Sequence, residues 1–272
     1  MRKQLYIFFI FITVSSAMLA QAEKRHFRQH ELGILLGGAY YIGDLNPNKH
    51  FYAPQPAGSI YYRFSPNYRY AFRGGLTYAT VLGDDSQSDN QDQIQRNLNF
   101  KTIIYEFDAI AEFNFLEYRI SNDKYKITSY LFLGIDVFHF TPRAQLGNEW
   151  YDLQPLRTEG ESSKYKLTQV GIPFGIGLKL NVSKNVGIGL EWGPRKIFTD
   201  YLDDVSGNYP NKYQNPLSSP LAEKLSDRSK NAGSNINKQR GNPRTKDWYY
   251  VFGVTINFKL TPKPEQCHAY PH

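Results

Sequence analysis

The sequence predicts an all-β protein, an eight-stranded antiparallel transmembrane β-barrel with a filled polar lumen, short periplasmic turns and longer extracellular loops. Three observations predict it. Apolar and polar side chains alternate along one segment after another, the apolar faces are about ten residues long, and short connections alternate with long ones. A strand of a water-soluble protein usually has about five or six residues, whereas about ten tilted residues cross a bilayer.

Residues 1–22 have the features of a cleaved signal peptide. Arg2 and Lys3 precede the apolar segment LYIFFIFITV, and Ala20 and Ala22 are placed as a cleavage site. The alternative is an uncleaved N-terminal anchor. Beyond residue 22 the sequence predicts a periplasmic lead-in at 23–30, the barrel at 31–260 and a periplasmic tail at 261–272. The predicted location is therefore the outer membrane of a Gram-negative cell.

Eight segments alternate in this way, and they are predicted to be the strands. They are, roughly, 31–42, 57–64, 70–80, 100–115, 127–140, 167–180, 186–194 and 247–259. The connections 43–56, 81–99, 141–166 and 195–246 are long and the other three are short, which places both termini on the side of the short turns. In the longest connection, a short helix is predicted with Pro220 in its first turn. We expect a β-bulge at Pro173, because proline lacks the N–H that a closed ladder uses.

One face of several strands has charged residues that the other face lacks. Because side chains fill the interior of a small barrel, these residues are predicted to form a buried network in the lumen, where unpaired ions would cost several kcal/mol each. They are Arg63, Arg73, Glu106, Asp108, Glu112, Asp136, Lys179 and Glu191.

Aromatic residues gather at the strand ends, where a ring at a membrane interface is half in water. The alternative is ordinary packing in a soluble β-sandwich, which would not need such long apolar faces. The aromatic residues predicted to form the interfacial girdles are Tyr40, Tyr41, Tyr61, Tyr62, Tyr78, Tyr105, Phe138, Phe140, Trp192, Trp248 and Tyr249.

The sequence predicts no enzymatic activity, no cofactor and no metal site. It contains no GxSxG, P-loop or HExxH motif. A lipid-active barrel enzyme would have to use Ser59 or Ser129 with His139, and its activity would depend on a single such residue. The acidic loop 83–92 lacks the spacing and the terminal Glu of a calcium-binding EF-hand.

The charge and the cysteine count narrow the possible partners. The formal net charge is +7, but Lys and Arg are spread along an exported chain, so no nucleic-acid binding is predicted. Cys267 is the only cysteine and lies in the predicted periplasmic tail. An unpaired cysteine of an exported protein indicates either an intermolecular disulfide or a tolerated free thiol.

The opening phrase HELGILLGGAYYIGDLNP resembles the PorG-like outer-membrane barrel family of the type IX secretion system, whose mature chains begin with E-x-G-x-x-x-G-x-x-Y-x-G-D-L-N. Similarity continues in RGGLTYATVLGDD, FDAIAEFNF, VGIPFGIGLKL and DWYYVFGVTINF, and so touches most of residues 30–260. The residues that match the opening motif are Glu31, Gly33, Gly37, Gly43, Asp44, Leu45 and Asn46, with Tyr40 or Tyr41 at the aromatic position.

The resemblance implies a non-enzymatic component of a protein-export machine. In that family the barrel sits in outer-membrane lipid, anchors or positions a periplasmic lipoprotein ring, and supports protein export or gliding. Our own hypothesis for the partner contacts is the tail residue Cys267 and the turn residues Arg119, Lys124 and Lys126. The alternatives are an OmpA-like structural or adhesive surface barrel, which predicts no stable periplasmic partner, and the lipid-active enzyme.

Overall fold

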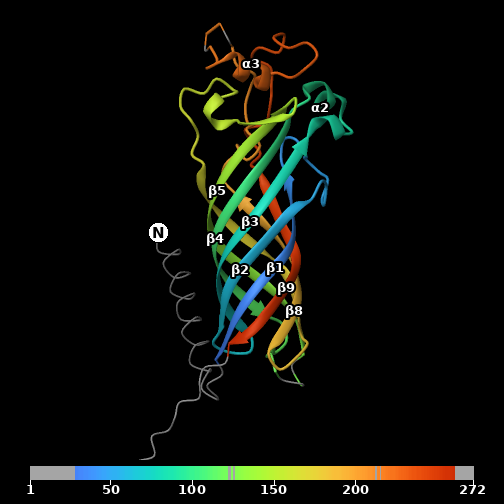
Figure 1. Ribbon diagram of the computed structural model, residues 1–272, viewed down its shortest axis with the longest axis vertical. Coiled ribbons are helices and arrows are strands. Elements are labelled where there is room, and N and C mark those ends of the chain that lie inside the picture. The colour runs from blue at the N-terminus through green and yellow to red at the C-terminus, as the bar shows by residue number, and fades with distance from the viewer. Residues whose placement is uncertain (1–27, 122–123, 125, 212, 215, 261–272) are drawn as a thin grey trace, which may run out of the picture.

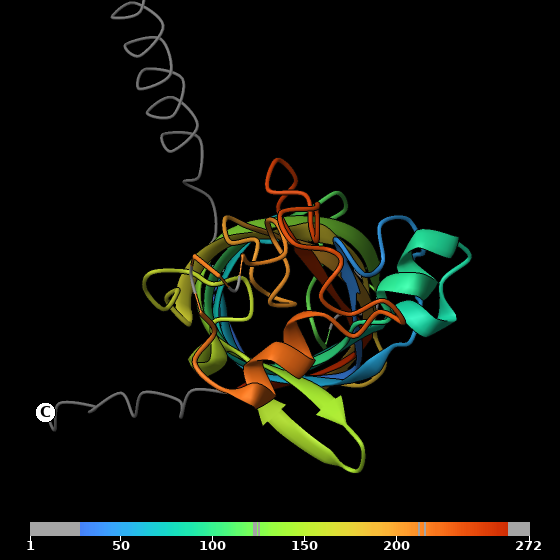
Figure 2. The ribbon, with the colours of Figure 1, turned by 90° about the horizontal axis from the view of Figure 1, so that it is seen from above.

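The computed structural model describes residues 28–121, 124, 126–211, 213–214 and 216–260, and these residues form a closed barrel (Figures 1 and 2). Each long strand pairs antiparallel with both neighbours, and the pairings of β1 with β9 and of β4 with β5 close the ring. The eight barrel strands are β1 (Gln29–Ile42), β2 (Gln55–Ser65), β3 (Tyr70–Asp84), β4 (Asn99–Asn114), β5 (Ile127–Leu146), β7 (Thr168–Asn181), β8 (Val186–Ile197) and β9 (Trp248–Leu260).

The predicted fold class is confirmed, and each predicted strand is present. The main difference lies at β5, which continues to Leu146 and turns back into the short strand β6 (Glu149–Asp152). The long connections also contain η1 (Asp85–Gln87), α2 (Gln91–Arg96), η2 (Gln154–Leu156) and the predicted short helix, α3 (Pro220–Ser226). We call the end with the long connections the outer end, and the opposite end the inner end.

The bulge predicted at Pro173 is wrong. Pro173 pairs with Arg195 in the same register that joins Gly171 to Ile197 and Ile176 to Trp192. On the other side of β7, the ladder to β5 is interrupted at Pro173 but resumes in an unchanged register. The missing N–H therefore removes a local pairing without inserting an extra residue.

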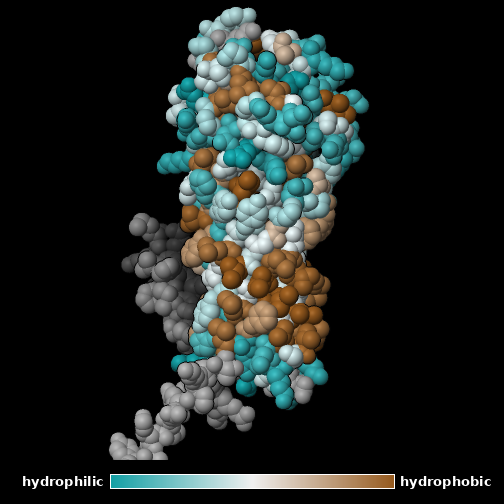
Figure 3. Space-filling model, viewed as in Figure 1, coloured by the Kyte–Doolittle hydropathy of each residue, from teal (hydrophilic) through white to brown (hydrophobic). Residues whose placement is uncertain are grey.

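The outer surface of the inner half of the barrel is an apolar belt (Figure 3). On β5, for example, Leu133 is 60% exposed and Ile135 is 69% exposed. Outward-facing Lys101 and Arg143 lie nearer the outer end of their strands. Contiguous apolar surface of this extent is unfavourable in water and matches the apolar band of a barrel in a bilayer. Among the described residues, no helix is long and apolar enough to cross a membrane.

The aromatic residues divide between the two faces of the barrel wall. Tyr62, Tyr78 and Tyr105 are exposed on the outer surface, as expected for a girdle. The girdle prediction is wrong for a second group, because these side chains are buried inside the barrel, where they belong to the apolar core. This group comprises Tyr41, Tyr61, Phe138, Phe140 and Tyr249.

The interior is closed at both ends. At the outer end, residues 199–206 enter the mouth of the barrel, where Leu202 and Val205 join an apolar core that includes Phe100 and Phe140. At the inner end, Tyr118 and Ile120 from the turn between β4 and β5 are buried against the bottom of the lumen. Between these two plugs lies the layer of charged side chains.

The seam between β1 and β9 depends on two glycines that pair directly, Gly37 and Gly253. A Cβ on Gly37 would lie 1.9 Å from the carbonyl oxygen of Phe252, so the strands would have to move apart. We expect Gly37→Ala to cost about 1–3 kcal/mol and to lower the fraction of protein that runs as a folded band on an unheated SDS gel. The control is Gly74→Ala, because a Cβ there meets nothing closer than 3.8 Å. Equal loss in both variants would contradict the close-approach explanation.

Candidate functional site

Glu112 is the centre of the charged layer inside the barrel. Its carboxylate lies 3.0 Å from Arg63 Nε, 3.3 Å from Arg73 Nη1 and 2.6 Å from Lys179 Nζ. The Glu112 side chain is 0% exposed, so these three cations take the place of water around it. The four residues come from β2, β3, β4 and β7 and therefore tie opposite walls of the barrel together.

Further pairs extend this network. Arg63 also contacts Glu31 at 2.8 Å, and Arg73 donates to both carboxylate oxygens of Glu191, at 2.6 and 2.7 Å. Tyr130 donates to Glu191 at 2.5 Å. Nearer the outer end, Arg195 contacts Glu106 at 3.3 Å, and the Tyr249 hydroxyl donates to the same carboxylate at 2.7 Å. Because a guanidinium group can bind carboxylates on other strands through several N–H groups, these contacts fix the register of several strands at once.

All eight residues predicted for the lumen are buried in the interior, but they are not equally connected. Within the described part of the chain, Asp108 and Asp136 form no salt bridge, and both carboxylate oxygens of Asp136 have no hydrogen-bond partner. Sequence reasoning missed Glu31 and Arg195 as members of the network. Arg195 faces inward on β8, two residues after the inward-facing Gly193. It was missed because the predicted strand ended at residue 194, one residue before it.

The serine and histidine that a lipid-active enzyme would need are not brought together. Ser59 lies on β2 at an inward position, whereas His139 faces outward on β5 and contacts Thr168. Ser129 and His139 share β5 but lie ten residues apart, about 33 Å along an extended strand. None of these residues forms a nucleophile–base pair.

The plug in the outer mouth is built around carboxyl groups. The Tyr41 hydroxyl lies 2.5 Å from Asp203 Oδ2 and 3.0 Å from Asp247 Oδ1, although it has a single hydrogen to donate. Two carboxyls around one hydroxyl hydrogen favour protonation of one of them, and a protonated carboxyl can donate to the Tyr41 oxygen. Burial, together with the neighbouring carboxylates, raises the pKa of Asp203 and of Asp247 well above the ordinary value.

Asp204 fixes the tip of the plug in a left-handed backbone conformation with φ 65°. Its carboxyl accepts hydrogen bonds from Thr158 at 2.5 Å and from Tyr165 at 2.6 Å. Burial raises the pKa of Asp204 to about 7, an effect that Arg240 partly offsets. The environment of the plug therefore favours the protonated form of these three carboxyl groups.

The residues of the opening motif extend from the charged layer of the lumen to the connections at the outer end. Glu31 lies in the charged layer, whereas Gly43 and Asn46 close a turn with backbone hydrogen bonds of 3.0 and 3.2 Å at the outer end. Leu45 joins the apolar core, and the Asp44 carboxylate accepts from the Asn242 amide at 3.0 Å. A Cβ on Gly43 would lie 2.1 Å from the Tyr41 hydroxyl, which explains why glycine stands there.

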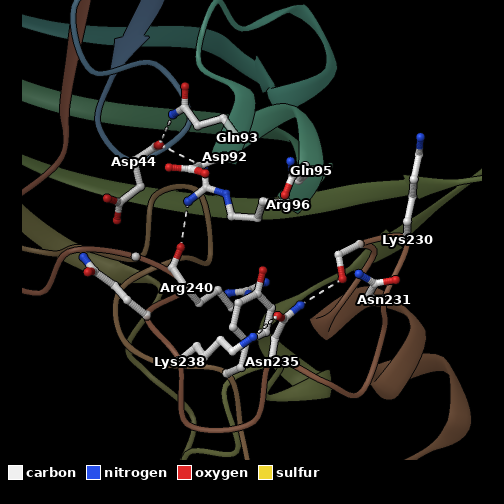
Figure 4. A pocket seen from close by; sticks show the side chains of 14 residues that line it. Asp44, Asp92, Gln93, Gln95, Arg96, Lys230, Asn231, Asn235, Lys238 and Arg240 are labelled. Carbon is white, nitrogen blue, oxygen red and sulfur yellow. Dashed lines mark hydrogen bonds between the residues drawn. The ribbon is translucent and has the colours of Figure 1, made fainter.

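A polar pocket of about 680 Å³ opens on the outer face, between α2 and the connection that precedes β9 (Figure 4). Arg96 forms one wall, with Nη1 donating to the Arg240 carbonyl at 2.7 Å and Nη2 donating to the Asp44 carbonyl at 2.9 Å. Sequence reasoning did not predict this pocket, because its walls come from three separate connections.

The inner rim consists of the described residues at 28, 66–69, 115–121, 124, 126, 182–185 and 258–260. The predicted contact residues Arg119, Lys124 and Lys126 lie here; Lys124 and Lys126 are exposed and Arg119 is half-buried. Cys267, like the predicted signal peptide and most of the lead-in, lies outside the described residues. Glu117 is the one acidic residue of the described rim. The basic residues are Arg28, Arg69, Arg119, Lys124, Lys126, Lys184 and Lys259.

Comparisons with known proteins give one family match and several similarities to solved structures. A family model described as "Domain of unknown function (DUF6089)" matches residues 3–218. A search of curated proteins found no match. Among solved structures, the chain is similar to Ail, the attachment invasion locus protein of Yersinia pestis, in complex with a heparin analogue, at 10% identity and a TM-score of 0.41, covering 86% of this chain and 99% of that one. It is also similar to a major outer membrane protein of Thermus thermophilus, at 10% identity and a TM-score of 0.42, covering 86% and 100%.

Proposed function

The chain belongs to the family described as domain of unknown function DUF6089, and from its sealed barrel we propose that it is a non-enzymatic outer-membrane anchor rather than a channel. The observation that carries this proposal is the combination of an apolar outer belt with a lumen that buried ion pairs cross and that a plug closes at each end. The belt holds the barrel in lipid. The Glu112 network and the two plugs occupy the space that a pore would need.

We propose further that the anchored partner is a periplasmic lipoprotein ring of a type IX secretion machine, and that the barrel supports protein export or gliding. The sequence resemblance of the opening motif and the closing strand supports this proposal. The charge of the inner rim supports it independently, because a cluster of Lys and Arg with a single described acidic residue favours an acidic partner surface. A disulfide through Cys267 could make that contact covalent.

The test is an affinity pull-down of the tagged protein from mildly solubilised envelopes, with and without reductant. We expect a periplasmic lipoprotein complex to copurify, and its recovery to fall about tenfold in a Lys124→Glu/Lys126→Glu variant, because reversed charges repel an acidic surface. The matched control is Lys164→Glu/Lys166→Glu, which changes two exposed lysines of the same spacing in an outer connection. A reductant-sensitive band that Cys267→Ser removes would place the tail at the contact. Recovery of the barrel alone would contradict the anchor.

One observation favours a second candidate, the OmpA-like surface barrel. The outer connections fold into a hydrogen-bonded cap instead of extending separately from the strand ends, and the cap carries a preformed pocket. A surface barrel would act through this cap and would need no periplasmic complex. Loss of function on deletion of the outer connection, with the inner-rim variant unaffected, would favour this candidate.

A further inference from the structure

The polar pocket on the outer face has the chemistry of a ligand site that goes beyond anchoring. We propose that it binds an acidic oligosaccharide, a chain of sugar rings that carries carboxylate groups. Its volume of about 680 Å³ lies within the usual range of small-molecule sites. The proposal does not depend on the identity of any periplasmic partner.

The walls of the pocket are fixed before any ligand arrives. The Arg96 guanidinium binds both oxygens of Asp85, at 2.7 and 2.8 Å, in addition to the Asp44 and Arg240 carbonyls. Arg240 is held in turn by Glu159 at 3.0 Å and by the Asp204 carbonyl at 2.7 Å. Figure 4 shows Arg96 crossing from α2 to the carbonyl of Arg240 on the opposite connection. A site whose walls are already held together loses little conformational entropy on binding.

The lining excludes apolar ligands. It contains no Val, Leu, Ile, Phe, Met or Trp, and its one aromatic residue, Tyr209, is buried with 7% exposure. A lipid tail or an apolar peptide side chain would therefore find no apolar side chain to pack against, and a nucleobase would find no exposed aromatic ring to stack on. The neighbouring pocket around α3 differs in this respect, because Leu146, Leu217 and Ile236 contribute to its walls.

The groups that remain available are suited to hydroxyls. Gln95, Asn231 and Gln239 line the pocket with exposed side-chain amides. Each amide offers a donor and an acceptor side by side, and each hydroxyl of a sugar can accept and donate in the same way. A hydroxyl-rich ring can therefore satisfy several of these groups at once.

The charge of the lining indicates an acidic sugar. Arg96 and Arg240 are paired with Asp85 and Glu159, and Asp44 accepts from the Asn242 backbone N–H. The exposed charges of the lining are therefore Lys230 and Lys238 against Asp92. Because the two arginines are engaged by the walls, the exposed Lys230 and Lys238 are the cations that can meet a ligand. Figure 4 shows Lys230 extending from the rim of the pocket, where a carboxylate on a bound chain could reach it.

The test is isothermal titration of the full-length protein in detergent with tetragalacturonic acid, and with maltotetraose as the neutral counterpart. We expect measurable binding of the acidic sugar and weaker binding of the neutral one. Asn231→Ala and Gln95→Ala should each weaken binding of the acidic sugar about tenfold, and Lys230→Ala should remove its advantage over the neutral sugar. Lys164→Ala and Asn148→Ala, which change exposed residues of an outer connection away from the pocket, are the matched controls and should change nothing.

A second arm separates the two sources of such a sugar. Lipopolysaccharide purified from the parent cells would bind in the same assay if the ligand belongs to the cell's own surface, whereas binding of tetragalacturonic acid without lipopolysaccharide binding would indicate an external saccharide. Failure of both probes, or equal binding to the pocket variants and to wild type, would overturn the proposal. Because pull-down of a periplasmic complex is measured separately, this failure leaves the anchor proposal intact.

Discussion

Glu112→Gln is expected to lower the free energy of unfolding of the barrel by about 3–5 kcal/mol, which is the cost of removing one partner of a buried ion pair. The substitution keeps the size of the side chain and removes its charge. Arg63 and Arg73 would retain Glu31 and Glu191. Lys179 would lose its carboxylate and keep only uncharged partners, among them the Asn114 oxygen at 2.9 Å and the Tyr130 ring at 4.2 Å. The Lys179 side chain is 2% exposed, so its ammonium group cannot regain water. Urea unfolding in lipid vesicles, followed by tryptophan fluorescence, measures the change.

Asp108→Asn is the matched control, because Asp108 lies on the same strand and the same inward face as Glu112. It has no salt bridge within the described chain, so removing its charge is expected to be neutral or stabilising. A further check is Lys179→Met in the Glu112→Gln background, which removes the stranded cation and should recover part of the loss. Equal destabilisation by Glu112→Gln and Asp108→Asn would show that ion pairing does not hold the lumen together.

Residue alternation predicts which side chains share a face but not which of them meet. Arg63 and Arg73 lie directly opposite each other on β2 and β3, an unfavourable arrangement for two cations on local grounds. It is tolerated because Glu112 reaches both from β4, although Glu112 itself pairs with Ala71. Such diagonal contacts depend on the stagger of the closed barrel, which single-strand patterns do not contain.

The outer cap was less predictable for a different reason. The connection 195–246 is polar and has no period of two, so nothing in its pattern marks Leu202 and Val205 as core residues. They become buried only because the mouth of the barrel offers an apolar ring around Phe100 and Phe140. Likewise, the pocket walls join residues far apart in the sequence, such as Arg96 and Arg240. Only the short helix α3, with its Ser219 cap and Pro220 in the first turn, had a local signal.

Raising the pH from 5 to 8 is expected to open the outer plug at least tenfold more often, because the closed plug binds protons that the open plug releases. Burial raises the pKa of Asp204 from 3.8 to about 7 and that of Asp44 to about 6, and it raises those of Asp203 and Asp247 in the same direction. A raised carboxyl pKa gives stability that is complete below pH about 4 and is lost as the pH rises through the closed-state value. For Asp204 alone, the amount is about 4 kcal/mol.

Hydrogen–deuterium exchange of residues 199–207, corrected for the chemical exchange rate at each pH, measures the opening. Asp204→Asn should make the difference between the two pH values smaller, because asparagine does not ionise. Its carbonyl oxygen can accept from Thr158 or Tyr165, and its amide NH2 can donate to the hydroxyl oxygen of the other. Asparagine also tolerates the left-handed backbone at φ 65° better than alanine, so the variant separates ionisation from strain. Glu223→Gln, on the exposed face of α3, is the control and should keep the full pH dependence. More opening at pH 5 than at pH 8 would contradict the assignment of protonated carboxyls, because ionised carboxylates held by Arg240 would be released by acid and not by base.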